Sequence, residues 1–160
     1  MRTGLGIDSH RFAEGRRLIL GGVEIPHTRG LDGHSDADVL AHAITDAILG
    51  AASMGDIGMH FPDTDVRWKD ADSIELLREI VRRVAASGWR VEHVDATVML
   101  ERPKLAPHRD AMMARLGEAV GASVHVKATT GEGMGFVGRE EGIAAMAVAT
   151  LTFTPHGRLI

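Results

Sequence analysis

The 160-residue sequence contains no cysteine and no tyrosine, and aromatic residues make up only 4% of it. The absence of cysteine excludes disulfide bonds and thiolate metal sites. The scarcity of aromatic rings and the net charge of −4 argue against a nucleic-acid partner. There is no apolar run long enough to cross a bilayer and no secretory leader pattern. We therefore expect a cytoplasmic protein that has no membrane partner.

The residues that are present suit one globular domain, with 44% apolar and 25% charged residues. Hydrophobic periodicity predicts helices over residues 36–53, 73–87 and 107–120, and strands over 1–10, 18–20, 23–25, 89–100, 123–129 and 143–153. The expected fold class is an α+β two-layer sandwich, a mixed β-sheet packed on helices. It would form a single domain over residues 1–160, with 154–160 as a loose tail.

The last predicted strand, residues 143–153, is apolar at nearly every position. One face of this strand would pack on the helices, and the other face also needs cover. We therefore expect the sheet to contact another subunit.

Residue types that bind metals gather at the first strand and the first helix. Asp8 and His10 are two residues apart, so they project to the same side of a strand. Asp38, His42 and Asp46 share one face of the predicted helix. Asp8, His10 and His42 would give Zn²⁺ three protein ligands and an open fourth position, with Asp38 or Asp46 orienting the His42 ring. A solvated helix face with i,i+4 ion pairs is the alternative.

Two segments suit phosphate groups. His34 precedes the first helix beside Ser35, the expected N-cap, with Asp38 completing a capping box; N–H groups at a helix N-terminus favour anions. The segment TTGEGMG, residues 129–135, has hydroxyls, glycines and a carboxylate that suit a diphosphate with a bridging cation. Its spacing is not that of a Walker loop. A surface histidine and a plain glycine-rich hairpin loop are the alternatives.

Five blocks of the sequence, in order, resemble the 2-C-methyl-D-erythritol 2,4-cyclodiphosphate synthase family. They are GIDSH at 6–10, GHSDADVLAHAITDAILGAASMGDIG at 33–58, FPDTD at 61–65, RPKLAPH at 102–108, and VKATT-x-E-x-x-GF-x-GR-x-EGIA at 126–144. The resemblance covers nearly the whole chain. It departs at Gly131 and Gly133, where many members carry a hydroxyl residue and a lysine.

The resemblance implies a phosphorus–oxygen lyase of the non-mevalonate isoprenoid route. Such an enzyme converts 4-diphosphocytidyl-2-C-methyl-D-erythritol 2-phosphate to 2-C-methyl-D-erythritol 2,4-cyclodiphosphate and releases CMP. It would be a homotrimer with inward-facing sheets, sites between subunits, and room for a prenyl diphosphate on the trimer axis. By position, the resemblance assigns the zinc ligands to Asp8, His10 and His42, a Mg²⁺ or Mn²⁺ ligand to Glu132, and stabilisation of the transition state to His34 and Thr130.

The resemblance also implies contacts with a substrate linked to cytidine diphosphate. The matching positions are Asp8, Ser9, His10, His34, Ser35, Asp56, Ile57, Gly58, Phe61, Pro62, Asp63, Thr64, Asp65, Leu100, Glu101, Arg102, Pro103, Lys104, Leu105, Ala106, Thr129, Thr130, Gly131, Glu132, Phe136 and Arg139. Residues 100–106 would form the cytosine pocket. Two other functions use the same features: a metal-dependent phosphohydrolase that activates water, and a non-catalytic trimeric binder of prenyl diphosphates.

Overall fold

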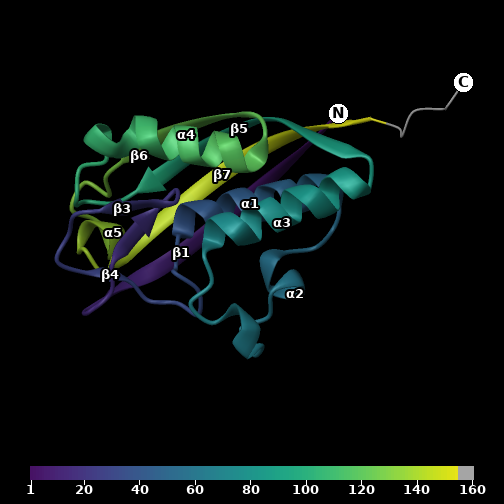
Figure 1. Cartoon of the computed structure of the whole chain (residues 1–160). Helices are drawn as coiled ribbons and strands as arrows, with labels where there is room; N and C mark the ends of the chain where they lie inside the picture. Colours follow the sequence, from purple (N-terminus) through teal and green to yellow (C-terminus); the bar gives the residue numbers. More distant parts are fainter. Residues whose placement is uncertain (155–160) are drawn as a thin grey trace, which may run out of the picture.

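The computed structural model describes residues 1–154, and its centre is a five-stranded mixed sheet (Figure 1). The strand order is β4–β1–β7–β5–β6, in which β5 and β6 pair in parallel and the other pairs are antiparallel. The strands are β1 (Arg2–Ala13), β4 (Gly30–Leu31), β5 (Trp89–Met99), β6 (Ser123–Thr129) and β7 (Gly142–Phe153). A separate hairpin joins β2 (Leu18–Leu20) to β3 (Val23–Ile25), and both strands have the predicted bounds.

Three helices cover one face of this sheet (Figure 1): α1 (Val39–Ala52), α3 (Ser73–Ala86) and α4 (Arg109–Val120). The predicted two-layer α+β fold is therefore confirmed. The connecting segments contain short turns that were not predicted: α2 (Ile57–His60), η1 (Val66–Trp68), η2 (Ala106–His108) and α5 (Gly135–Gly138). Apart from Thr154, the predicted tail lies outside the described residues.

The predicted start of the first helix is wrong. Helix α1 begins at Val39, and its N-cap is Asp38, whose carboxylate accepts a hydrogen bond from the Ala41 N–H. The same buried carboxylate accepts hydrogen bonds from the backbone N–H groups of Gly21 and Gly22, at 2.9 and 2.7 Å. Burial raises the pKa of Asp38. Asp38 thus ties the β2–β3 hairpin to the start of α1, a role that a local capping pattern does not reveal.

Helix α1 lies directly on strand β1 because two glycines allow the close approach. A Cβ at Gly4 would lie 2.1 Å from the Ala47 carbonyl oxygen, and one at Gly6 would lie 1.9 Å from the Ala43 carbonyl oxygen. The alternation that points Gly4 and Gly6 at α1 continues to Asp8 and His10. The close packing therefore places the polar end of β1 against the first turns of α1.

The sheet face opposite the helices carries a set of exposed apolar side chains, which we call the outer apolar patch. Leu5 and Ile7 of β1 are 61% and 59% exposed, and Met146 and Val148 of β7 are 38% and 40% exposed. In the β1–β7 register, Leu5 pairs with Val148 and Ile7 with Met146, so the patch is continuous. The apolar side chains of the last strand are thus shared between the core and this open face.

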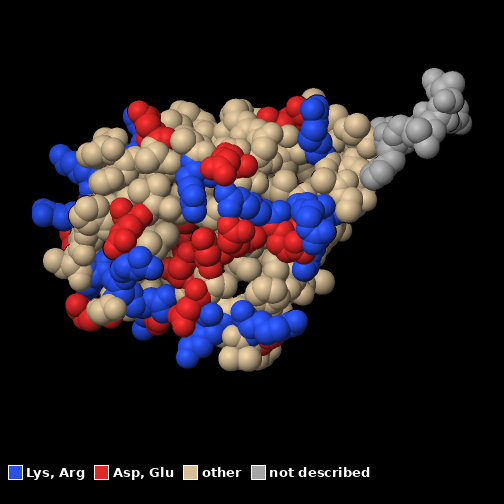
Figure 2. Space-filling view, viewed as in Figure 1, with Lys and Arg blue, Asp and Glu red and all other residues tan. Residues whose placement is uncertain are grey.

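Acidic and basic side chains lie next to each other on the helical side of the molecule (Figure 2). On α3, Arg78 pairs with Glu75, while Arg82 and Arg83 both pair with Glu79. Within residues 1–154, every helix is too short or too polar to span a membrane.

Candidate metal centre and substrate cavity

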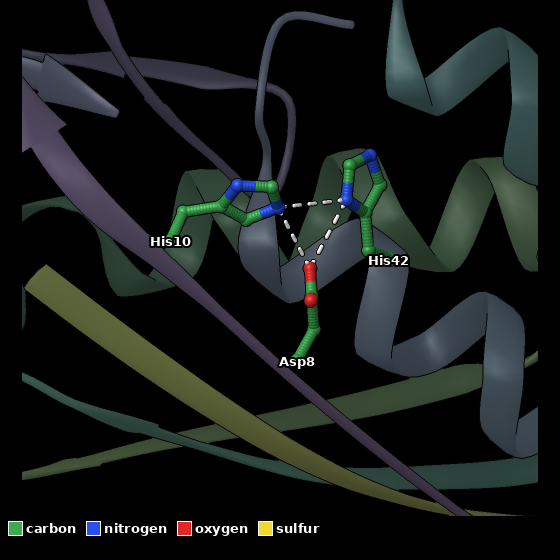
Figure 3. A group of neighbouring side chains, drawn as sticks. All are labelled: Asp8, His10 and His42. Atoms are coloured by element: carbon green, nitrogen blue, oxygen red, sulfur yellow. Dashed lines mark hydrogen bonds and ion pairs between the residues drawn. The ribbon is translucent and has the colours of Figure 1, made fainter. Parts of the chain in front are cut away.

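Three candidate ligands converge between β1 and α1 (Figure 3). The Oδ2 atom of Asp8 lies 2.9 Å from Nε2 of His10 and 3.1 Å from Nδ1 of His42. The two imidazole nitrogens are 3.3 Å apart. In the described part of the chain, no other group of three or more His, Asp or Glu residues comes together in this way. The structure therefore brings together the three residues that the sequence singled out.

The donor set fits a divalent cation. Tetrahedral Zn²⁺ bonds of about 2.0–2.1 Å place neighbouring donor atoms roughly 3.3 Å apart, close to the separations seen here. The second nitrogen of each imidazole also has a partner. Nδ1 of His10 donates to the Asp32 carbonyl at 2.6 Å, and Nε2 of His42 faces the hydroxyls of Ser35 and Ser73. Each imidazole can therefore present a lone pair to the shared centre.

The electrostatics of this centre follow from the same contacts. Burial acts to raise the pKa of Asp8, but the neighbouring His10 and His42 rings outweigh it and hold that pKa far below its usual range. Burial acts to lower the pKa of His10, yet the Asp8 carboxylate raises it overall. Asp8 is therefore ionised at neutral pH, and a bound metal must displace the proton that Asp8 favours on His10.

The predicted supports of the His42 ring are wrong. The carboxylate of Asp38 is taken by backbone N–H groups, and Oδ1 of Asp46 accepts from the Ile57 N–H at 2.8 Å, which holds the start of α2. The ring instead contacts Ser35 and Ser73, at 3.1 and 2.9 Å. Sharing a helix face fixes the direction of a Cβ but not the partner of a ring nitrogen. Ser73 lies 31 residues from His42 in the sequence, and no local pattern around Ser73 indicates this contact.

A cavity of about 410 Å³ opens beside the three ligands. Its polar wall includes the predicted residues His10, His34, Ser35, His42, Gly58 and Asp63. Its apolar wall is formed by Ile57, Phe61 and Pro62, together with Trp68 and Leu76, which sequence reasoning missed. Asp56 N-caps α2 by accepting from the Met59 N–H, and Nε2 of His34 lies 3.2 Å from the Asp65 carbonyl oxygen. The predicted helix N-terminus at His34 is wrong, because α1 begins five residues later.

A second cavity, of about 240 Å³, gathers the predicted cytosine segment and the hydroxyl-bearing loop. Its lining includes Leu100, Glu101, Pro103, Lys104, Leu105, Ala106, Thr129 and Thr130. None of these residues lines the first cavity. Arg102 instead reaches toward Glu140, at 3.7 Å. One chain therefore presents the two predicted halves of the site in separate cavities.

The loop that follows β6 is held by hydrogen bonds within the loop and by one to Glu101. The Thr130 hydroxyl donates to Oε1 of Glu132 at 3.0 Å, and the Glu132 N–H donates back to the hydroxyl at 3.2 Å. The Gly131 N–H donates to Oε1 of Glu101. A Cβ at Gly131 would lie 2.8 Å from the Gly138 nitrogen, so glycine suits the close packing here.

The other two predicted contacts lie beyond this loop. Phe136 lines another cavity with Ser9 and His10, and Arg139 pairs with Glu141 at 2.8 Å.

The fold and the site define a class: a two-layer α+β protein whose sheet and first helix present two histidines and a carboxylate to a partly apolar cavity. Residues 1–152 match the model of the YgbB family. The chain belongs to this family, and it is an enzyme.

Relatives and solved structures agree with this membership. The 2-C-methyl-D-erythritol 2,4-cyclodiphosphate synthase of Salinibacter ruber is 62% identical over 94% of this chain and 98% of its own length. The bifunctional enzyme IspD/IspF of Anaeromyxobacter dehalogenans is 64% identical over 93% of this chain but only 39% of its own length.

Among solved structures, the bifunctional IspDF of Campylobacter jejuni superposes with a TM-score of 0.91 at 45% identity, over 95% of this chain and 42% of that one. A CDP-bound form of 2C-methyl-D-erythritol-2,4-cyclodiphosphate synthase superposes with a TM-score of 0.86 at 41% identity, over 94% of this chain and 100% of that one.

Proposed function

We propose that this enzyme converts 4-diphosphocytidyl-2-C-methyl-D-erythritol 2-phosphate to 2-C-methyl-D-erythritol 2,4-cyclodiphosphate in the non-mevalonate route to isoprenoids. An oxygen of the 2-phosphate forms a bond to the β-phosphorus, the bond from that phosphorus to the bridging oxygen breaks, and CMP leaves with the electron pair. The observation that carries the proposal is the convergence of Asp8, His10 and His42 beside a cavity that also holds His34. The identities with synthases of that name support it.

The residues fit two cations with different tasks. Asp8, His10 and His42 would hold Zn²⁺, and Glu132 would supply a carboxylate oxygen to Mg²⁺ or Mn²⁺, which prefer oxygen ligands. When bound, the cations would neutralise the two mutually repelling phosphates and the leaving CMP. No protein nucleophile is needed, because the attacking phosphate is already ionised.

The residues of the protein itself would orient the substrate and stabilise the charge that develops on its phosphates. His34 lies on the wall of the first cavity, where its ring can face a phosphate oxygen. Thr130 lies in the second cavity and offers a hydroxyl beside Glu132. Ile57, Phe61 and Leu76 give the first cavity an apolar wall that suits the carbon skeleton of the sugar alcohol.

A homotrimer with sites shared between subunits accounts for two further observations. The first cavity, beside the candidate metal ligands, and the second cavity, which holds the predicted cytosine segment, have no lining residue in common. The proposed reaction requires both cavities to contact one substrate molecule. The outer apolar patch, with Leu5 and Ile7 more than half exposed, needs a cover. Packing three sheets face to face would cover the patch and bring one subunit's metal centre to its neighbour's cytosine pocket.

We expect the protein to sediment as a trimer at micromolar concentration. If the site is shared, a mixture of His42→Ala and Thr130→Ala chains, unfolded and reassembled together, should regain activity that neither variant has alone. Some interfaces would then combine an intact metal centre with an intact Thr130 loop. Sedimentation velocity and the activity of the mixed sample test both statements. An active monomer, or a mixture as inactive as its components, would contradict the shared site.

The reaction itself is tested by incubating the purified protein with the cytidyl substrate, with and without a metal chelator. We expect CMP and a cyclic diphosphate in equal amounts, and loss of both products when chelator is added. A phosphohydrolase would yield an open-chain product that has gained water, which mass spectrometry separates from the cyclic one. A non-catalytic binder of prenyl diphosphates would release no CMP. Either result would overturn the proposal.

A further inference from the structure

Behind His42, on the side away from the metal-binding centre, lies a buried chain of hydrogen bonds that ends on a carboxylate. Ser73, the first residue of α3, is 1% exposed. Its hydroxyl lies 2.9 Å from Nε2 of His42 and donates a hydrogen bond to Oδ1 of Asp36. The hydrogen bonds therefore connect the Asp36 carboxylate, through the Ser73 hydroxyl, to Nε2 of His42, a candidate metal ligand.

The direction of these hydrogen bonds determines which His42 nitrogen carries the proton. A serine hydroxyl has one proton, and here that proton is given to Asp36. The Ser73 oxygen must then accept from His42, so Nε2 of His42 is the protonated nitrogen. In the neutral ring, Nδ1, which faces Asp8 at 3.1 Å, is then left with its lone pair. A metal ion requires this tautomer.

The carboxylate at the end of the chain is itself held in place. Oδ2 of Asp36 accepts from the Ser73 N–H at 3.1 Å, and Oδ1 accepts from the Asp38 N–H at 3.1 Å. The Asp36 N–H donates to the Ala71 carbonyl, also at 3.1 Å. Asp36 is thus fixed between the segment before α1 and the start of α3. It keeps the proton of the Ser73 hydroxyl pointing away from His42.

We propose that Asp36 and Ser73 are positioning residues that fix the His42 tautomer and ring orientation, and so raise the affinity of the Asp8–His10–His42 centre for its metal. The inference rests on the proposed zinc site. Ser35, 3.1 Å from the same nitrogen, is a weaker partner because it has no carboxylate behind it. Because Ser73 is on α3 and His42 is on α1, the packing of these two helices determines which hydrogen-bond partner the His42 ring has.

The test is a zinc titration of the purified protein in competition with a chromophoric chelator. Ser73→Ala should weaken zinc binding by about 10–100-fold, the usual effect of removing a partner behind a metal-bound histidine. Asp36→Asn should also weaken zinc binding, since a neutral amide is a poorer acceptor for the Ser73 proton. The double variant should lose little more than the stronger single variant, because both changes break one path.

Thr45→Val is the matched control. Thr45 is a buried residue on α1 whose hydroxyl donates to the Ala41 carbonyl at 2.8 Å and forms no hydrogen bond with His42. This variant should keep the zinc affinity of the parent protein. Thermal unfolding of the zinc-free variants shows which of them keep the fold, and Ser73→Ala remains informative if Asp36→Asn does not fold.

A second readout addresses the tautomer directly. In the zinc-free protein, ¹⁵N–¹H spectra of the histidine rings should show His42 protonated at Nε2, and Ser73→Ala should populate the other tautomer. An affinity and a tautomer that both stay unchanged in Ser73→Ala would overturn the inference while leaving the zinc site standing. A parent protein that binds no zinc at all would overturn the proposed metal and the inference together.

Discussion

Replacing His42 with alanine is expected to abolish zinc binding and to lower turnover at least about 10³-fold, or ~4 kcal/mol of transition-state stabilisation, while the protein stays folded. The substitution leaves Asp8 and His10, two ligands where an open catalytic site needs three. The fold should survive because the imidazole makes polar contacts at the edge of the core and the apolar stripe of α1 is untouched.

Metal analysis of the purified variant, circular dichroism and CMP release are the measurements. His27→Ala is the control, since His27 packs on the Phe12 ring and is not a member of the ligand group. It should retain one zinc per chain and normal turnover. Full zinc occupancy in folded His42→Ala would remove His42 from the ligand set.

Changing Glu132 to glutamine is expected to keep zinc but to lower kcat at least about tenfold and to weaken the response of turnover to Mg²⁺ or Mn²⁺. The amide oxygen of glutamine can still accept from the Thr130 hydroxyl, so the loop should keep its conformation and lose only the charge. Because that charge would hold the cation that counters the leaving CMP, the loss should appear mainly in kcat.

Steady-state kinetics across magnesium and manganese titrations decide the question. Glu118→Gln on α4 is the matched control, an exposed acid paired with Arg78 and absent from the lining of both cavities. A solvent-facing Glu132 with no metal role predicts a change of less than about twofold, under ~0.5 kcal/mol. An unchanged metal response in Glu132→Gln would exclude it as a ligand.

Much of the scaffold could be read from local patterns. Helix α3 begins at Ser73, the predicted start, directly after its N-cap Asp72. The alternation along β1 correctly placed Asp8 and His10 on one side of the strand. The two strands on either side of Gly21 and Gly22 were predicted at their observed bounds. Each of these features depends on residues within one or two turns of each other.

The sequence by itself therefore determined the order of the main elements, the side of β1 that bears the ligands, and the family motifs. Only the tertiary structure decided that Ser73 and Asp36 support His42, that Asp38 caps α1 while holding a distant hairpin, and that Trp68 and Leu76 complete the cavity wall. It also decided that two of the candidate metal ligands and the predicted cytosine segment line separate cavities of one chain. The physical reason is that periodicity fixes only where a Cβ points. Partners 31 or 37 residues apart meet because α3 packs on α1, and that packing is set by the whole core.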